Sequence, residues 1–262
     1  MRTDTDAHVH LENGPLTVDY VWEFVKAAEE KGVQHLQILD HTHRFYEFAP
    51  MYKDVIQADP RQKAWFEKKQ VNSIQDYISL IEACRKEAFP IDVTFGLEVC
   101  WADWRQDFLK EQLAVYPFDF LVGSVHSVLD GRLYDMDGWS REILWDVEPA
   151  EKIYKAYFDQ VRSALSSGLF TQIGHPDVIK MYQIDPGYDL QPEYESVAAL
   201  AAAHDVLLEE NTGAHYRYHH PEAGLSEAFR KAIETAGAKR ISASDAHYPA
   251  HVAKDFDCLP RD

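Results

Sequence analysis

The chain alternates short apolar runs with longer amphipathic stretches along its whole length, and this alternation strongly limits the folds open to it. The first unit reads DAHV, then TVDYVWEFVKAAEEKG, then HLQILD, which predicts a strand, a helix and a second strand. Repeated units of this kind predict parallel strands joined by helical crossovers. Five further strand candidates follow the first two: Asp92–Glu98, Asp119–Val125, Phe170–Gly174, Val206–Glu210 and Arg240–Ser244. Seven strands in this pattern predict a barrel-like α/β fold.

The helices between these strands carry recognisable end signals. Thr17 or Asp19 can cap the first helix, and Gly32 follows its basic end. The stretch Lys152–Ser167 ends in the same way, at Gly168. The predicted crossovers are therefore genuine helix candidates.

The chain is long enough to bury a substantial core. With 262 residues and 46% hydrophobic residues, and with no repeat or low-complexity linker, it predicts a single domain over residues 1–262. The least regular region, about residues 44–75, is interpreted as an insertion after the second strand. An active-site insertion and a plain surface excursion are equally good interpretations of it.

Acidic residues outnumber basic ones by 44 to 26, for a formal net charge of −18. Such a surface repels the phosphate backbone, so nucleic acid is an unlikely partner. Only the insertion offers a basic patch that could override this: Arg44, Arg61, Lys63, Lys68 and Lys69. Salt-sensitive binding of single-stranded DNA would support that alternative.

Three cysteines in no CxxC spacing favour neither a disulfide framework nor a cysteine-rich zinc site. The first ten residues contain no apolar core of a signal peptide, and no segment approaches the roughly 20 apolar residues that a membrane span needs. We therefore expect a soluble, cytoplasmic protein with no membrane partner. Its oligomeric state is not predicted.

Potential metal ligands recur where the predicted strands end. In a parallel α/β barrel the loops after the strands line one mouth, so residues far apart in the sequence converge there. A lone histidine at such a place is usually an ordinary polar residue, but a series of them indicates a site. The donors are His8 and His10 after strand one, His41 after strand two, Glu98, His126 and His175 after the next three, and Asp245 and His247 after the last.

The number of donors predicts more than one metal. His8 and His10, at i and i+2, lie on one side of an extended chain and can hold one cation, although two hydrogen-bonded histidines would give the same pattern. A single catalytic zinc commonly takes three protein ligands and water, so a mouth with about nine donors exceeds one ion's needs. Glu98, midway through the series, is the best bridging carboxylate. Two or three close cations could activate water and stabilise a phosphoryl group under attack.

The order of these motifs resembles that of the PHP (polymerase and histidinol phosphatase) superfamily, from His8 to His247. The segments GLEV, FLVGSVHSVLDG, SGLFTQIGHPDVIK, LLEENTGAHYR and SASDAHYP are similar to the histidinol-phosphatase branch. The resemblance implies a distorted, TIM-like (β/α)7 barrel with a trinuclear site at the C-terminal mouth of the strands. It also implies a phosphomonoesterase that uses metal-bound hydroxide, with L-histidinol phosphate as the leading substrate in histidine biosynthesis.

Carried over residue by residue, the resemblance implies three groups of metal ligands. They are His8, His10, Glu98 and Asp245 for the first metal, Glu98, His126 and His175 for the second, and His41 and His247 for the third. Family members complete the third site with a residue soon after HxH, often a histidine, and Glu12 is the substitute here. Zn, Mn and Fe all suit these donors.

Further roles are hypotheses. Arg217 lies where the phosphatase branch tends to carry an arginine for substrate phosphate, although it could simply balance local charge. Glu98, Asp245, His247 and Asp177 are the catalytic candidates, while Asp40, His43 and His215 could orient imidazoles or donate protons. A set of side chains near the predicted mouth could form a substrate wall or, more simply, pack the loops: Phe45, Tyr46, Trp65, Cys100, Trp101 and Trp104.

Two groups of alternatives remain. A protein-tyrosine phosphatase, phosphodiesterase or exonuclease of the same superfamily would use nearly the same ligands. A non-catalytic metal-binding regulatory module would keep the fold without turnover, and the complete donor set counts against it.

Overall fold

The computed structural model describes residues 4–135 and 138–260. Its main sheet has seven strands in the order β1-β2-β3-β4-β7-β8-β9, and every neighbouring pair is parallel. The strands are β1 (Thr5–His10), β2 (His35–Leu39), β3 (Asp92–Cys100), β4 (Phe120–Ser124), β7 (Gln172–Ile173), β8 (Leu207–Asn211) and β9 (Arg240–Ala243). Each lies within or overlaps one of the seven predicted strands.

The two ends of the sheet meet and almost close it into a barrel. Val9 forms a parallel bridge with Ala246, and the backbone N–H of His10 donates to the Ala246 carbonyl at 2.7 Å. Nearer the beginning of β1 on the same seam, the Ser242 hydroxyl donates to the Thr5 carbonyl at 2.6 Å. The predicted distorted, TIM-like (β/α)7 barrel is confirmed.

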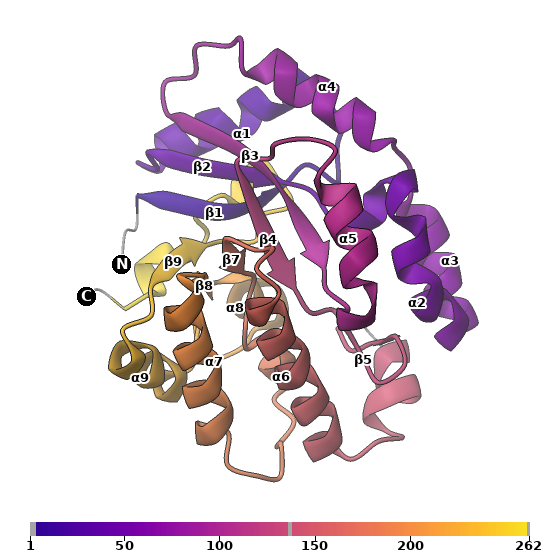
Figure 1. Cartoon of the computed structure of the whole chain (residues 1–262). Coiled ribbons are helices and arrows are strands. Elements are labelled where there is room, and N and C mark those ends of the chain that lie inside the picture. Colours follow the sequence, from indigo (N-terminus) through magenta and orange to yellow (C-terminus); the bar gives the residue numbers. More distant parts are fainter. Residues whose placement is uncertain (1–3, 136–137, 261–262) are drawn as a thin grey trace.

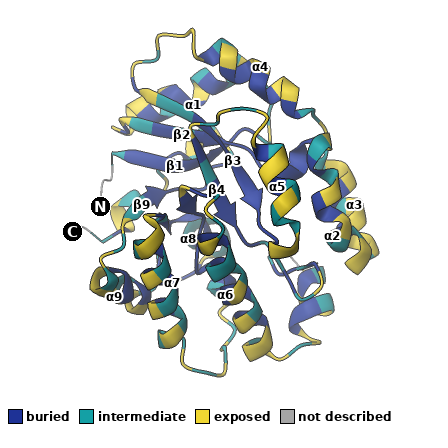
Figure 2. Ribbon diagram, in the orientation of Figure 1, coloured by how far each residue is buried: buried dark blue, intermediate teal, exposed yellow. Residues whose placement is uncertain are grey.

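Helices surround this sheet (Figure 1). They are α1 (Val18–Glu30), α2 (Lys53–Ala58), α3 (Pro60–Lys69), α4 (Ile74–Cys84), α5 (Gln106–Leu113), α6 (Ala150–Ser166), α7 (Gln191–His204), α8 (Gly213–Tyr218) and α9 (Glu227–Ala236). Figure 2 shows buried strands inside and exposed residues on the outward faces of the helices. This distribution is expected where amphipathic crossovers cover a parallel sheet. None of the helices in these ranges is long and apolar enough to span a bilayer.

The helix ends follow from local sequence. The Thr17 side chain caps α1 by accepting from the Tyr20 backbone N–H at 3.3 Å, so Thr17 rather than Asp19 is the cap. Gly32 and Gly168 follow α1 and α6 with φ of 77° and 70°, a left-handed conformation that glycine adopts without steric cost.

The region predicted as an insertion forms a compact excursion beside the barrel mouth. It begins in the 3-10 helix η2 (Tyr46–Tyr52), continues through α2 and α3, and returns to pair Phe45 with Asn72 in a parallel bridge. Asp59 caps α3 through the Arg61 backbone N–H, and Pro60 occupies its first turn. Because its two ends are tied together, the excursion leaves the order of the barrel strands unchanged.

A short antiparallel hairpin, not predicted from the sequence, follows β4. It consists of β5 (Ser127–Val128) and β6 (Arg132–Leu133). Gln62 of α3 donates to the Gly131 carbonyl at 2.9 Å and accepts from the Leu133 N–H at 2.8 Å. The insertion and the hairpin are thereby joined above the barrel mouth.

Candidate metal centre

The HxH motif lies at the carboxyl end of β1. His8 and His10 are fully buried on one side of the strand, and their Nε2 atoms are 2.9 Å apart. Asp245 follows β9 across the barrel seam, with Oδ1 at 3.3 Å from His10 Nε2 and 3.8 Å from His8 Nε2. The structure therefore brings together these three residues, as the sequence predicted.

Glu98 lies at the centre of the donor cluster, as a bridging carboxylate would. Its Oε1 is 3.1 Å from His175 Nε2 and 3.4 Å from His126 Nε2. Its Oε2 is 2.8 Å from His41 Nε2 and 3.3 Å from the Nε2 atoms of both β1 histidines. Each oxygen thus faces a different set of imidazoles.

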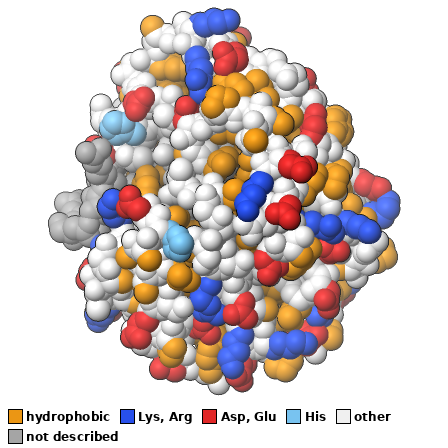
Figure 3. Space-filling view, in the orientation of Figure 1, with side chains coloured by type: hydrophobic (Ala, Val, Ile, Leu, Met, Phe, Trp, Pro, Cys, Tyr) orange, Lys and Arg blue, Asp and Glu red, His pale blue; other side chains and the backbone are white. Residues whose placement is uncertain are grey.

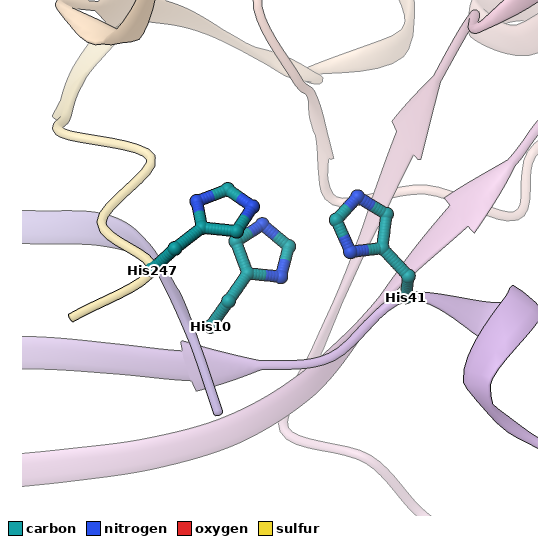
Figure 4. Close-up of side chains that lie close together, drawn as sticks. All are labelled: His10, His41 and His247. Carbon is teal, nitrogen blue, oxygen red and sulfur yellow. The ribbon is translucent and has the colours of Figure 1, made fainter. Parts of the chain in front are cut away.

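The third group of potential metal ligands, the third corner of the site, surrounds Glu12. Figure 4 shows the imidazoles of His10, His41 and His247 approaching one another from three separate segments. The ring centroid of His10 lies 4.2 Å from that of His41 and 4.3 Å from that of His247. Glu12 Oε1 is 3.3 Å from His247 Nε2, and Oε2 is 3.4 Å from His41 Nδ1 and 3.5 Å from His43 Nε2. His43, expected only as a supporting residue, is therefore a fourth donor at this corner.

Two of the donors occupy strained backbone positions. His175 and Asp245 have φ of 32° and 56°, a region that non-glycine residues seldom adopt. Strain of this kind gathers at functional sites, where surrounding contacts hold it. The glycine before His175 lets this segment pack closely against Ser124 at the end of β4. A Cβ at Gly174 would lie only 2.3 Å from Ser124 Oγ.

Burial favours the neutral, metal-binding form of four imidazoles, including His10, whose pKa it holds well below the usual range. It lowers the pKa of His126 to about 3, and of His43 and His247 to about 4. His8, His41 and His175 differ: burial opposes their charge, but nearby carboxylates, Glu98 beside all three, raise their pKa, to about 10 for His41. The carboxylates thus attract positive charge at the place where a cation would bind.

The donor set fits divalent transition metals. Several buried polar atoms at the centre lack hydrogen-bond partners in the described part of the chain, including Glu98 Oε2, Glu12 Oε2 and both ring nitrogens of His43. Unpartnered buried polar atoms are costly, and coordination would satisfy them. Four three-residue groups have ligand atoms within 4.8 Å of one another: His8, His10 and Glu98; His41, Glu98 and His126; His10, His41 and His247; and Glu12, His41 and His43. Mixed imidazole and carboxylate donors suit Zn, Mn and Fe.

Behind the donors lies Glu209, a β8 residue that sequence reasoning missed. Its Oε1 accepts from Gln172 Nε2 at 3.0 Å and lies 2.8 Å from His8 Nδ1. Its Oε2 accepts from Asn211 Nδ2 at 2.9 Å and from the His175 backbone N–H at 3.0 Å. A proton on His8 Nδ1 leaves Nε2 free to face the cluster, so Glu209 orients a candidate ligand.

The remaining predicted residues separate into those at the site and those outside it. Arg217 lines the site, with one nitrogen on Asp245 Oδ2 and the other 3.0 Å from His247 Nδ1. Asp177 instead accepts from Lys180 Nζ at 2.8 Å and the Ser226 N–H at 3.0 Å, and is not in the cavity wall. Its expected catalytic contact is therefore absent from this geometry.

Two supporting candidates also have structural partners. His215 Nδ1 lies 2.8 Å from an Asp255 oxygen, in a separate surface hollow. Asp40 accepts from Arg44 at 2.6 Å, and both side chains are buried beneath the loop that carries His41. This pair positions the loop and does not reach the cavity.

A cavity of about 360 Å³ opens over the cluster, a size suited to a small ligand. Of the side chains considered as a substrate wall, only Trp65 and Cys100 line it. Trp101 is buried edge-on against Phe170, and Trp104 is half exposed at the surface. The insertion thus contributes to the cavity wall through α3, which carries Trp65, and the active-site interpretation of it is favoured.

The basic residues of the insertion do not form a free patch. Arg44 is buried against Asp40, while Arg61 pairs with Asp59 at 2.9 Å and Glu142 at 2.5 Å. Figure 3 shows positive and negative side chains interspersed over the displayed face. A polynucleotide groove finds no support here, which agrees with the overall negative charge.

Fold and site together define a class of protein: a parallel barrel with clustered histidines and carboxylates at the mouth formed by its strand ends. The PHP domain family model matches residues 6–213, and the chain belongs to the PHP family. The predicted membership is confirmed, and the histidinol-phosphatase branch fits the relatives.

Three proteins are similar to this chain, and the two solved structures among them share its fold. A curated protein of Deinococcus radiodurans, named "Probable histidinol-phosphatase", is 28% identical over 257 residues, covering 96% of this chain and 89% of its own length. A Listeria monocytogenes structure assigned as a histidinol phosphatase has a TM-score of 0.75 at 20% identity, covering 97% of this chain and 98% of its own. A Lactococcus lactis histidinol phosphate phosphatase, solved with Zn, L-histidinol and phosphate, has a TM-score of 0.61 at 16% identity, covering 97% and 91%.

Proposed function

We propose that this chain hydrolyses L-histidinol phosphate to L-histidinol and phosphate at a centre of two or three divalent metal ions. The observation that carries the proposal is the convergence of buried imidazoles on the two oxygens of Glu98. The substrate itself rests on the relatives, because no side chain considered so far requires an imidazole-bearing ester.

Bound metals would supply an activated water and neutralise the charge of the phosphoryl group. The chain's own residues would set the geometry. Arg217 lies at the edge of the cluster with its two terminal nitrogens on Asp245 and His247, and this fork would suit a phosphate oxygen pair once metals hold those two residues. In the reaction one P–O bond to water forms as the P–O bond to the alcohol breaks, and the alcohol oxygen takes up a proton.

We propose the following assignment of the ligands. His8, His10, Glu98 and Asp245 hold the first metal, and Glu98, His126 and His175 the second. Glu12, His41 and His247 hold the third, with His43 as an additional donor beside Glu12. The 262 residues act as one domain, and the enzyme works in the cytoplasm as part of histidine biosynthesis.

The activity test compares metal-loaded enzyme on L-histidinol phosphate and on unrelated phosphomonoesters. We expect kcat/KM to be at least about tenfold higher for the former, a difference of about 1.4 kcal/mol in transition-state stabilisation. Equal rates would reject the substrate, and absence of any phosphatase activity would instead favour a regulatory module. Hydrolysis of single-stranded DNA or a phosphotyrosine peptide would identify another phosphoesterase.

The third corner has its own test. Glu12→Gln should lower the metal content by about one ion per chain, measured by inductively coupled plasma mass spectrometry. Glu47→Gln is a matched control, because Glu47 accepts from the Ser73 hydroxyl at 2.5 Å and the Ile74 N–H at 2.8 Å and lies outside the cavity wall. Unchanged metal content in Glu12→Gln would remove Glu12 from the ligand set.

A further inference from the structure

Asp135 is a cavity residue that neither the metal centre nor the phosphate contact uses. It lies two residues beyond β6 of the short hairpin and lines the cavity over the cluster. The preceding residue, Tyr134, is fully buried and fixes this segment: its hydroxyl donates to the Val125 carbonyl at 2.6 Å, and its own carbonyl accepts from Trp145 Nε1 at 3.0 Å. The carboxyl group of Asp135 is thus attached to a firmly held backbone.

Among the carboxylates lining the cavity, Asp135 differs from the others in having no ion pair within 4 Å in the described ranges, although the charges of His175, His41 and Arg217 act on it from farther away. Glu12 lies 3.2 Å from Lys69 Nζ, and Asp245 contacts Arg217. Asp135 Oδ1 is buried and accepts no hydrogen bond from any residue the structure describes. Burial raises the pKa of this carboxyl to about 6, which still leaves it mostly ionised at neutral pH.

Asp135 also lies apart from the proposed metal sites. None of the four donor groups found within residues 4–135 and 138–260 includes it. Side chains with largely apolar surfaces share the cavity wall with it, including Leu133, Val178 and Met181. A carboxylate with a buried, unsatisfied oxygen is costly unless a cation pairs with it.

We propose that Asp135 binds a cationic amino group of the substrate, so that the site selects phosphomonoesters that carry an ammonium group. Metals and Arg217 would attract the phosphate, and Asp135 would attract the opposite charge elsewhere in the same cavity. This inference rests on the proposed phosphatase activity and adds the recognition of a doubly charged substrate. Asp135 is then a specificity-determining residue.

The test compares esters that differ only in the amino group. L-Histidinol phosphate is paired with 3-(imidazol-4-yl)propyl phosphate, and ethanolamine phosphate is paired with ethyl phosphate. Asp135→Asn should raise KM for the amino esters roughly tenfold to a hundredfold, as expected when a charge-assisted hydrogen bond is lost, while kinetics on the amine-free esters change less than about twofold. Calorimetry with L-histidinol in the presence of phosphate should show the same loss of affinity.

Asp130→Asn is the matched control. Asp130 lies in the turn of the same hairpin, is exposed and is not in the wall of this cavity. It should leave both substrate pairs unchanged. Circular dichroism and metal content, measured for both variants, identify a folding or ligand defect.

Three results would overturn the proposal. One is an equal loss on amino and amine-free esters. Another is a lower kcat on both alkyl esters with p-nitrophenyl phosphate unaffected, which would make Asp135 a proton donor to the leaving group. The third is a fall in metal content. If L-histidinol phosphate proves not to be the substrate, the ethanolamine and ethyl pair still decides whether Asp135 selects an ammonium group.

Discussion

Replacing Glu209 by glutamine should weaken metal binding although no proposed ligand is removed. The carboxylate of Glu209 faces four groups, two at each oxygen: Gln172 Nε2 and His8 Nδ1 at Oε1, and Asn211 Nδ2 and the His175 N–H at Oε2. A glutamine side chain has one carbonyl oxygen and one NH₂ group. Whichever way the amide is turned, its NH₂ meets two nitrogens that donated to the carboxylate.

The size of the effect follows from these contacts. If the amide turns its NH₂ toward His8 Nδ1, the ring is driven to the tautomer whose Nε2 carries the proton, and Nε2 can no longer bind a metal. If it turns the other way, the His175 backbone N–H loses its acceptor while its residue stays at a φ of 32°. Loss of such an orienting partner commonly lowers metal affinity by about 10- to 100-fold. This corresponds to about 1.4–2.8 kcal/mol of binding free energy.

The assay is a competition titration of the metal-free protein against a chromogenic zinc chelator. Glu210→Gln provides a matched control, because Glu210 is the next residue of β8 and its side chain lies on the other side of the strand. Glu210 pairs with Arg230 at 2.8 Å and Arg240 at 2.7 Å, and its side chain is fully buried. Its replacement should lower the free energy of unfolding by about 3–5 kcal/mol, the cost of breaking a buried ion pair, with little effect on zinc affinity.

Two outcomes would refute this reasoning. If Glu209→Gln binds zinc as tightly as the unmodified chain, the contact with His8 does not orient a ligand. If Glu210→Gln loses as much affinity as Glu209→Gln, the effect reflects general destabilisation of β8 and says nothing about the tautomer of His8.

Three further predictions concern the cavity, the bound metals and the thiols. Arg217→Lys should raise KM for phosphomonoesters about tenfold or more in steady-state assays, because a single ammonium cannot reproduce the two-nitrogen fork; an unchanged KM would contradict a phosphate contact. Chelation should abolish activity and lower the melting temperature in calorimetry, since ions that bind the folded chain stabilise it, and an unchanged melting temperature would count against folded-state binding. At pH 8 a thiol reagent should modify exposed Cys258 but neither buried Cys84, whose pKa burial raises to about 12, nor buried Cys100; more than one rapidly reacting thiol would contradict the burial.

The strand-end donors could be predicted because the fold rule that gathers them is general. Once seven parallel strands are recognised, their carboxyl ends share one mouth, and Glu98 or His126 needs no further information to be placed there. Glu12 is assigned to the third corner only through the family resemblance, as the substitute for a residue soon after HxH, and it lies there beside His247. The same fold rule predicts a cavity position for Asp177, but the chain turns there into the 3-10 helix η5 (Val178–Tyr182). The carboxylate of Asp177 accepts from Lys180 of that helix instead.

The hairpin that precedes Asp135 could not be predicted. Strands of two residues, such as β5 and β6, are too short to produce a periodic pattern. Their position depends on Gln62, which is distant in sequence and fully buried. Asp135 itself is one acidic residue among 44 Asp and Glu, and only the cavity distinguishes it.

Glu209 shows how a barrel interior supports its mouth. Strand alternation places Glu209 and Glu210 on opposite sides of β8, but the sequence LLEEN does not say which of them faces inward. The inward residue contacts both the His8 ring and the His175 backbone, and these two residues belong to different proposed metal sites. Loss of both Glu209 oxygens, as in Glu209→Ala, should therefore weaken both sites together, whereas a change at Glu12 should affect one. Comparing metal binding in the two variants distinguishes a residue that supports two metal sites from a residue that is a ligand of one.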